Sequence, residues 1–259
     1  MLTGCSVIAI SGLGSHPFGS WQRHGSDKSY MWIRDEIPGS IPGARAILYG
    51  YDASLTDSDS FQSIRDIARG LFEQLRATGW QRVAAASLAF LAHSLGGIVL
   101  MDALLQIADS RNSVDAPILD KVRGAILFGV PTLGMEQSNL QAMTEGQVNE
   151  TIVQDLSRES NYLRNLNESY LGVSRLRRLR VFWGYETRTS PTVEVCPSRP
   201  RCLVCCRSDS RTPPGSEVQV DGGRQRAGTR YWWTGSRQHV VTSTTIRSQR
   251  FPSTRTTLI

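Results

Sequence analysis

The chain has 259 residues, of which 40% are hydrophobic and 20% charged, which is enough to bury the core of one α/β domain with or without a tail. No stretch approaches the roughly 18 consecutive apolar residues of a membrane span, and the first residues lack the basic flank and long apolar run of a secretory signal. We therefore expect a cytosolic or peripheral protein with no transmembrane segment.

The net charge of +6 is unevenly distributed. Residues 195–259 hold eleven arginines, no lysine and three acidic residues, so they carry +8 and the first 194 residues carry −2. Four of the five cysteines also lie there, at Cys196, Cys202, Cys205 and Cys206. The body therefore resembles an ordinary domain of a reducing compartment, with no specific nucleic-acid binding.

Short apolar runs alternate with helical patterns in the first part of the chain. Buried strands are expected at 6–10 and 44–51, and an amphipathic helix at 32–37 closed by Pro38. A polar loop over 54–60 leads into the next helix.

That helix is expected over 61–75, where five apolar residues recur at helical spacing. Asp57 or Ser60 is the expected N-cap, and Gly79 closes the helix. The apolar face consists of Phe61, Ile64, Ala68, Leu71 and Leu75.

The stretch 87–101, SLAFLAHSLGGIVLM, reads as a buried strand, a sharp turn and a helix over 97–105. This is the context of the nucleophile elbow, which strains a serine so that Oγ projects at the carboxyl edge of a sheet, at the positive end of a helix. Ser94 would be that serine, in the pattern A-x-S-x-G formed with Ala92 and Gly96, and His93 and Gly97 complete the turn. The alternative is an ordinary helix start capped by Ser94.

The later elements continue the alternation. Residues 109–120, with Pro117, read as a surface loop, and the strands and helices that follow complete a parallel, doubly wound sheet of α/β class. Strands are expected at 125–130, ended by Pro131, and at 179–185, with helices at 148–156 and 162–171. The basic run 175–180 could face anionic headgroups or simply be a polar connection.

A glycine-rich loop, 11–17, follows the first strand. Such a loop can bring backbone N–H groups close to a substrate oxygen, as an oxyanion hole requires. The expected donors are the N–H groups of Leu13 and Leu95, and the alternative is a plain turn.

Five segments occur in a characteristic order: SGLGSHPFGSW, ARAILYGYDA, FLAHSLGGIVLMDAL, RGAILFGVPTLG and VFWGYET. Together, over roughly residues 5–194, they resemble the lipase-like α/β-hydrolase domain of serine-active-site-containing proteins and of many fungal proteins, where it often precedes nucleotide-binding and repeat modules. The resemblance implies an α/β-hydrolase fold, hydrolysis of esters or lipid esters, a nucleophile at Ser94 and an acid at or near Glu186. It also allows peripheral association with the mitochondrion or endoplasmic reticulum and a role in lipid metabolism.

Two motifs depart from that family. Ser11-Gly12 stands where His-Gly is usual. This difference should leave the oxyanion hole intact, because its donors are backbone N–H groups. The segment 131–134, Pro-Thr-Leu-Gly, stands where Pro-His-Arg-Gly is usual, which should alter a wall of the pocket.

A serine nucleophile needs an imidazole to take its proton and a carboxylate to orient that imidazole. The chain order in this fold is serine, acid, histidine. Of the four histidines, His16 and His24 precede Ser94, although His16 could line the pocket, and His93 lies beside it but points away. Only His239 follows Glu186, so His239 is the expected base.

From 195 on, the chain is rich in Arg, Ser, Thr, Pro and Gly and shows no apolar periodicity. We expect a disordered tail, or one translated out of frame, in place of the final strand and histidine turn of the family. Cys202 and Cys205 form half of a zinc knuckle without a second pair, so neither a metal nor a cofactor is expected.

Two functions from different classes remain open. One is a serine hydrolase in which Glu186 orients His239, His239 deprotonates Ser94, and the Leu13 and Leu95 amides hold the oxyanion. The other is a catalytically inactive hydrolase fold that serves in interaction or sensing, or a truncated gene product.

Overall fold

A parallel sheet in the order β2-β1-β3-β4-β5 forms the centre of the molecule. The structure is a computed structural model that describes residues 4–22, 28–55, 58–82, 86–136, 140–141, 144–185 and 247–248. A sixth strand, β6 (Arg247–Ser248), lies antiparallel beside β5. The other strands are β1 (Gly4–Ile10), β2 (Arg45–Tyr49), β3 (Ala86–His93), β4 (Val122–Phe128) and β5 (Arg180–Gly184).

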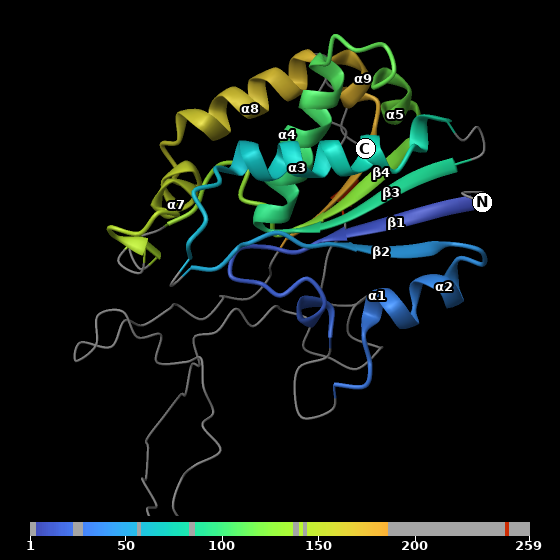
Figure 1. Cartoon of the computed structure of the whole chain (residues 1–259), viewed down its shortest axis with the longest axis horizontal. Coiled ribbons are helices and arrows are strands. Elements are labelled where there is room, and N and C mark those ends of the chain that lie inside the picture. Colours follow the sequence, from blue (N-terminus) through green and yellow to red (C-terminus); the bar gives the residue numbers. More distant parts are fainter. Residues whose placement is uncertain are drawn as a thin grey trace, which may run out of the picture.

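The sheet is doubly wound, as the sequence predicts (Figure 1). The connection from β1 to β2 covers one face with η1 (Gly19–Trp21), α1 (Trp32–Asp35) and α2 (Ile37–Ser40). The other face carries α3 (Ile64–Ala77), η2 (Trp80–Arg82), α4 (Leu95–Asp109), α5 (Ala116–Lys121), α7 (Glu150–Asp155), α8 (Asn161–Gly172) and α9 (Ser174–Arg177). The strand order reverses between β1 and β3, which is where sheets of this kind bind ligands.

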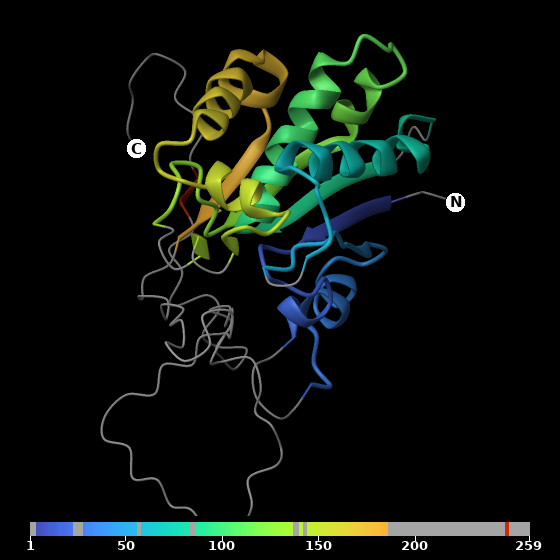
Figure 2. The same cartoon turned by 60° about the vertical axis from the view of Figure 1, so that its left-hand side comes forward.

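Helices cover both faces of the sheet (Figure 2), and an apolar core lies on each of these faces. Because strand side chains alternate, β1 sends Ile8 and Ile10 into the larger core and Val7 and Ala9 into the smaller one. Buried side chains of α3 and α4 fill the larger core. In the described part of the chain, no helix combines the length and the apolarity needed to cross a membrane.

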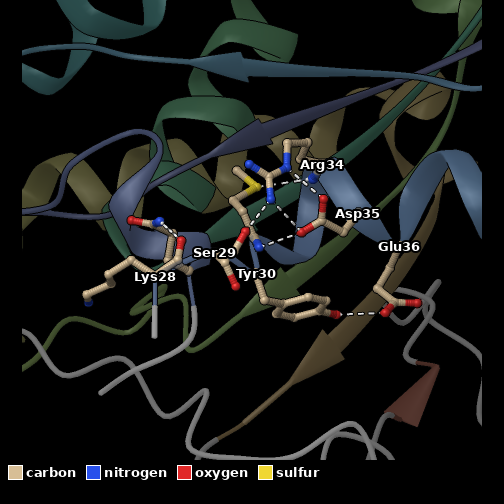
Figure 3. A network of polar contacts seen from close by, with 8 residues as sticks. Lys28, Ser29, Tyr30, Arg34, Asp35 and Glu36 are labelled. Carbon is tan, nitrogen blue, oxygen red and sulfur yellow. Dashed lines mark hydrogen bonds and ion pairs between the residues drawn. The ribbon is translucent and has the colours of Figure 1, made fainter. Parts of the chain in front are cut away.

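Hydrogen bonds within the chain fix the short helix α1 (Figure 3). The Met31 N–H donates to Asp35 Oδ2 at 2.7 Å, and the Arg34 guanidinium donates to Asp35 Oδ1 at 2.6 Å and to the Ser29 carbonyl oxygen. The Tyr30 hydroxyl donates to Glu36 Oε1 at 2.8 Å. A helix of one turn is not stable by itself, so these bonds hold the cover of the smaller core in place.

Two prolines lie in other positions than the sequence suggested. Pro38 was expected to close a helix and Pro117 to lie in a surface loop, but each lies in the first turn of a helix, α2 and α5 respectively. The N–H groups of a first turn have no partner inside the helix, so proline loses nothing there.

The start of α3 also differs from expectation. Phe61 lies before the helix and is 81% exposed, so it is not part of the buried face that Ile64, Ala68 and Leu71 form. The N-cap is Ser63 rather than Asp57 or Ser60: the Asp66 N–H donates to Ser63 Oγ at 3.2 Å, and the Ser63 N–H donates to Asp66 Oδ2 at 2.9 Å. This reciprocal pair is a capping box. The closing role of Gly79 is confirmed by its φ of +75° directly after the C-cap Thr78.

We expect Ser63→Ala to lower the free energy of unfolding by about 1 kcal/mol, because it removes the cap of α3. The matched variant Ser60→Ala, at the cap position that the sequence suggested, should change it by less than about 0.5 kcal/mol. Urea unfolding followed by circular dichroism measures both. Equal losses in the two variants would contradict the assignment of Ser63 as the cap.

Candidate active site

Ser94 occupies the turn between β3 and α4 with φ 51° and ψ −126°. Among the described residues it is the one non-glycine residue with a positive φ. A β-carbon makes this conformation costly, by about 1–3 kcal/mol, and such residues gather at functional sites. The predicted strained turn is confirmed.

Ser94 is also more accessible than its neighbours. Ser94 is partly exposed, and all the other residues from Phe90 to Leu104 are buried. The α4 helix that follows is packed on all sides by buried residues, so its N-terminus is fixed in place. The serine therefore lies at the positive end of an immobilised helix.

The loop after β1 touches this turn directly. A β-carbon on Gly12 would lie 2.9 Å from Ser94 Cβ and 3.1 Å from His93 Nδ1. A β-carbon on Gly96 would lie 2.4 Å from the Ser11 carbonyl oxygen. The distances of 2.9 and 2.4 Å are shorter than real Cβ contacts, so glycine is required at both positions for the two segments to meet.

Hydrogen bonds to neighbouring segments hold the loop after β1 in place. The Tyr51 hydroxyl, just beyond β2, donates to the Ser11 carbonyl oxygen at 2.8 Å. The Gly14 N–H donates to the Ala53 carbonyl oxygen at 2.6 Å. Local sequence does not predict these bonds, because which residues face each other across strands depends on the tertiary register.

The end of β4 supports the turn from the other side. The Ser94 N–H donates to the Phe128 carbonyl oxygen at 2.9 Å. A β-carbon on Gly97 would lie 2.2 Å from Val130 Cγ2, so the second glycine of the turn admits the chain that leaves β4. The ends of β1, β3 and β4 are thus held together around Ser94.

The two expected oxyanion donors lie on these segments. Leu95 opens α4 and is fully buried, and the first N–H groups of a helix have no partner within the helix. Leu13 is in the loop whose Gly12 lies against Ser94. Both residues are next to the serine turn in sequence or contact, and their role as oxyanion donors stays a prediction.

The two histidines of the described residues are poor candidates for the base that activates Ser94. His93 is buried, and burial lowers its pKa from 6.5 to about 4. The exposed His16 accepts hydrogen bonds at Nδ1 from the N–H groups of Phe18 and Gly19, at 3.2 and 3.1 Å, so this lone pair is already engaged. Glu186, His24 and His239 lie outside the described residues.

A cavity of about 550 Å³ lies away from this turn, between α3 and the far end of α4. It is lined by Arg65, Arg69, Phe72, Arg76, Arg111 and Asp115, among others. Because α4 has 15 residues, this end is about 20 Å from Ser94, too far to hold the reacting part of a substrate. Within the described ranges, no three His, Cys, Asp or Glu side chains converge as metal ligands would, and Cys202 and Cys205 lie outside these ranges.

A parallel, doubly wound sheet with a positive-φ serine between a central strand and its helix defines the α/β-hydrolase type of fold. No family model matches the chain. The chain is distantly homologous to the protein SERAC1 of Danio rerio, at 23% identity over 199 residues. That match covers 70% of this chain and 30% of the relative, so the chain spans less than a third of the length of the curated relative it matches.

Two solved structures of lipolytic enzymes are similar to the chain. The phospholipase PlaB from Legionella pneumophila superposes with a TM-score of 0.51 at 15% identity, over 71% of this chain and 39% of that one. The mature lipase BlEst2 from Bacillus licheniformis gives a TM-score of 0.47 at 15% identity, over 68% of this chain and 63% of that one. The predicted fold class and the predicted resemblance to lipase-like α/β-hydrolase domains are confirmed.

We expect Gly96→Ala to lower the free energy of unfolding by about 1–3 kcal/mol, because the new methyl group meets the Ser11 carbonyl oxygen. The matched variant Gly39→Ala, in α2 with nothing within 4 Å, should leave stability unchanged or raise it. Urea unfolding compares the two. Equal stability of Gly96→Ala and the wild type would contradict the close approach of the β1 loop to the turn.

His93 should make stability depend on pH. Its folded pKa of about 4 lies below 6.5, so between these values the unfolded chain binds a proton that the folded chain does not. Stability should therefore fall as the pH drops from 6.5 towards 4, by up to about 3 kcal/mol more in the wild type than in His93→Gln. Urea unfolding across this pH range measures the difference in slope, and parallel slopes would contradict the burial of a neutral imidazole.

Proposed function

We propose that this domain is a serine hydrolase of carboxylic or lipid esters. The observation that carries the proposal is the strained, partly exposed Ser94 held against the β1 loop. Strain of this kind persists only where the surroundings impose it, and here three strand ends impose it on a nucleophilic side chain. The structural likeness to the phospholipase PlaB and the distant homology to SERAC1 support the same class of chemistry.

In the proposed reaction Ser94 Oγ attacks the carbonyl carbon of an ester while His239 accepts its proton. Glu186 orients the imidazole, and the N–H groups of Leu13 and Leu95 bind the oxyanion of the tetrahedral intermediate. Collapse of this intermediate expels the alcohol, which takes the proton from His239, and leaves an acyl group on Ser94. Water, deprotonated by the same imidazole, then releases the acid.

A catalytically inactive hydrolase fold is the second candidate, and one observation favours it. Among the described residues His16 already uses its Nδ1 lone pair, and His93 is a buried imidazole of low basicity. The base must therefore come from His24 or His239, outside the described residues. If neither reaches Ser94, the turn remains without its proton acceptor, and activity is lost.

A fluorophosphonate probe separates the two candidates. We expect it to label the folded protein, and Ser94→Ala to abolish the labelling because the probe needs the serine oxygen. Ser87→Ala, on the same strand at the opposite edge of the sheet, is the matched control and should label as the wild type does. A folded wild-type protein that is not labelled would favour the inactive fold.

Turnover of a chromogenic ester tests the base and the acid. His239→Ala should reduce turnover of a chromogenic ester by on the order of 10⁴- to 10⁶-fold, because triad members act as a unit. Glu186→Gln should reduce it severalfold or more, and His24→Ala should leave it unchanged. The reverse pattern, with His24 essential and His239 dispensable, would refute the assignment of His239 as the base.

A further inference from the structure

A cluster of basic side chains lies at the amino edge of the sheet, opposite Ser94. It consists of six cations at the end of α5, the start of β4, in α9 and at its C-cap, and at the start of β5: Lys121, Arg123, Arg175, Arg177, Arg178 and Arg180. The five arginines are exposed. We refer to these six residues as the basic patch.

The patch is continuous across four elements. Arg175 Nη2 donates to the Ala116 carbonyl oxygen at 3.1 Å and to Asp120 Oδ1 at 2.5 Å, which joins α9 to α5. Gly124 and Arg180 are paired in the sheet, so Arg123 and Arg180 lie at neighbouring strand starts. Figure 1 shows α5 and α9 side by side at the end of the sheet where the strands begin.

Few carboxylates balance this charge. In the segments 116–124 and 173–181 the acidic residue is Asp120, and it pairs with Arg175. The ion pairs found among the described residues include none from Arg123, Arg177 or Arg178, and none from Arg180. The patch therefore keeps most of its positive charge facing solvent.

Two segments of the carboxyl edge carry the opposite charge. The segments that follow β2 and β4, through α7 to the start of α8, contain one basic residue, Arg158, in their described parts. The same parts contain seven carboxyl side chains: Asp52, Asp59, Glu136, Glu145, Glu150, Asp155 and Glu159. In Figure 1, α7 lies at the far end of the sheet from α5 and α9. The described segments after β2 and β4 are thus acidic, whereas the described part of the loop after β1 carries Lys28.

The composition of the patch fits a lipid surface better than a nucleic acid. Single-stranded nucleic acids are bound by basic residues interleaved with several aromatic side chains. The segments 116–124 and 173–181 contain no aromatic residue, and beside them on β5 Phe182 is 39% exposed. An exposed aliphatic side chain, Val114, which is 51% exposed, lies just before α5 instead. A planar anionic surface also acts on the whole charge distribution, attracting the amino edge and repelling the carboxyl edge.

We propose that the basic patch docks this domain on an anionic lipid bilayer, with the carboxyl edge and Ser94 turned away from that surface. This inference goes beyond ester hydrolysis and does not depend on it. The main attraction is electrostatic, so binding weakens with salt and with loss of patch arginines.

The first test measures binding of the full chain to vesicles by co-sedimentation. Vesicles of phosphatidylcholine with 30% phosphatidylglycerol should bind the protein, and pure phosphatidylcholine vesicles should not. The variant Arg177→Gln/Arg178→Gln/Arg180→Gln should bind at least tenfold more weakly. The matched variant Arg65→Gln/Arg69→Gln/Arg158→Gln removes the same charge elsewhere and should bind within twofold of the wild type.

The second test measures orientation by hydrogen exchange on the vesicles. Peptides over 114–123 and 174–180 should gain protection, and peptides over 129–136 and 149–160 should not. Several outcomes overturn the proposal. The first is a patch variant that binds vesicles as tightly as the wild type does, which would assign binding to the arginines of 195–259. The others are protection of peptides at the carboxyl edge and absence of vesicle binding. Binding of poly(U) RNA in place of vesicles would also overturn it.

Neither test uses ester hydrolysis as its readout. The docking proposal and the serine-hydrolase proposal can therefore fail separately.

Discussion

The contact between the β1 loop and the β3–α4 turn is the constraint on which the site depends. Ser94 is held in a conformation that costs about 1–3 kcal/mol, so favourable packing around it must offset this free energy. Gly12 and Gly96 let the β1 loop approach, and Gly97 admits Val130 from the β4 side. Because all three contacts join rigid strand ends, the serine is oriented before any substrate arrives, as electrostatic preorganisation requires.

Local sequence predicted most of this architecture, for a physical reason. Parallel strands buried on both faces leave continuous apolar runs, and β1, β3 and β4 all read this way. Element ends were less predictable. Pro38 and Pro117 begin helices, because proline signals a first turn as readily as a break, and Phe61 fits a helical period but precedes the cap.

Within the site, the turn could be predicted and its surroundings could not. A serine between small residues after a buried strand is a local signal, whereas Tyr51 against Ser11 and Gly12 against Ser94 depend on the register between strands. The two described histidines also show what the sequence can and cannot predict. Their sequence positions alone made them poor bases, and the structure adds the reason: burial for His93 and an engaged Nδ1 for His16.

Charge acts on this domain over two ranges, and the two do not conflict. Within the first turn of α4 the helix dipole and backbone N–H groups favour negative charge, so an oxyanion beside Ser94 is stabilised locally. The carboxylates of the carboxyl edge act at longer range, where the Debye length of about 8 Å at physiological salt already weakens them. They therefore oppose the approach of anionic molecules and membranes without weakening chemistry at the serine. A neutral ester meets no such barrier, so the acidic edge is compatible with the proposed substrate class.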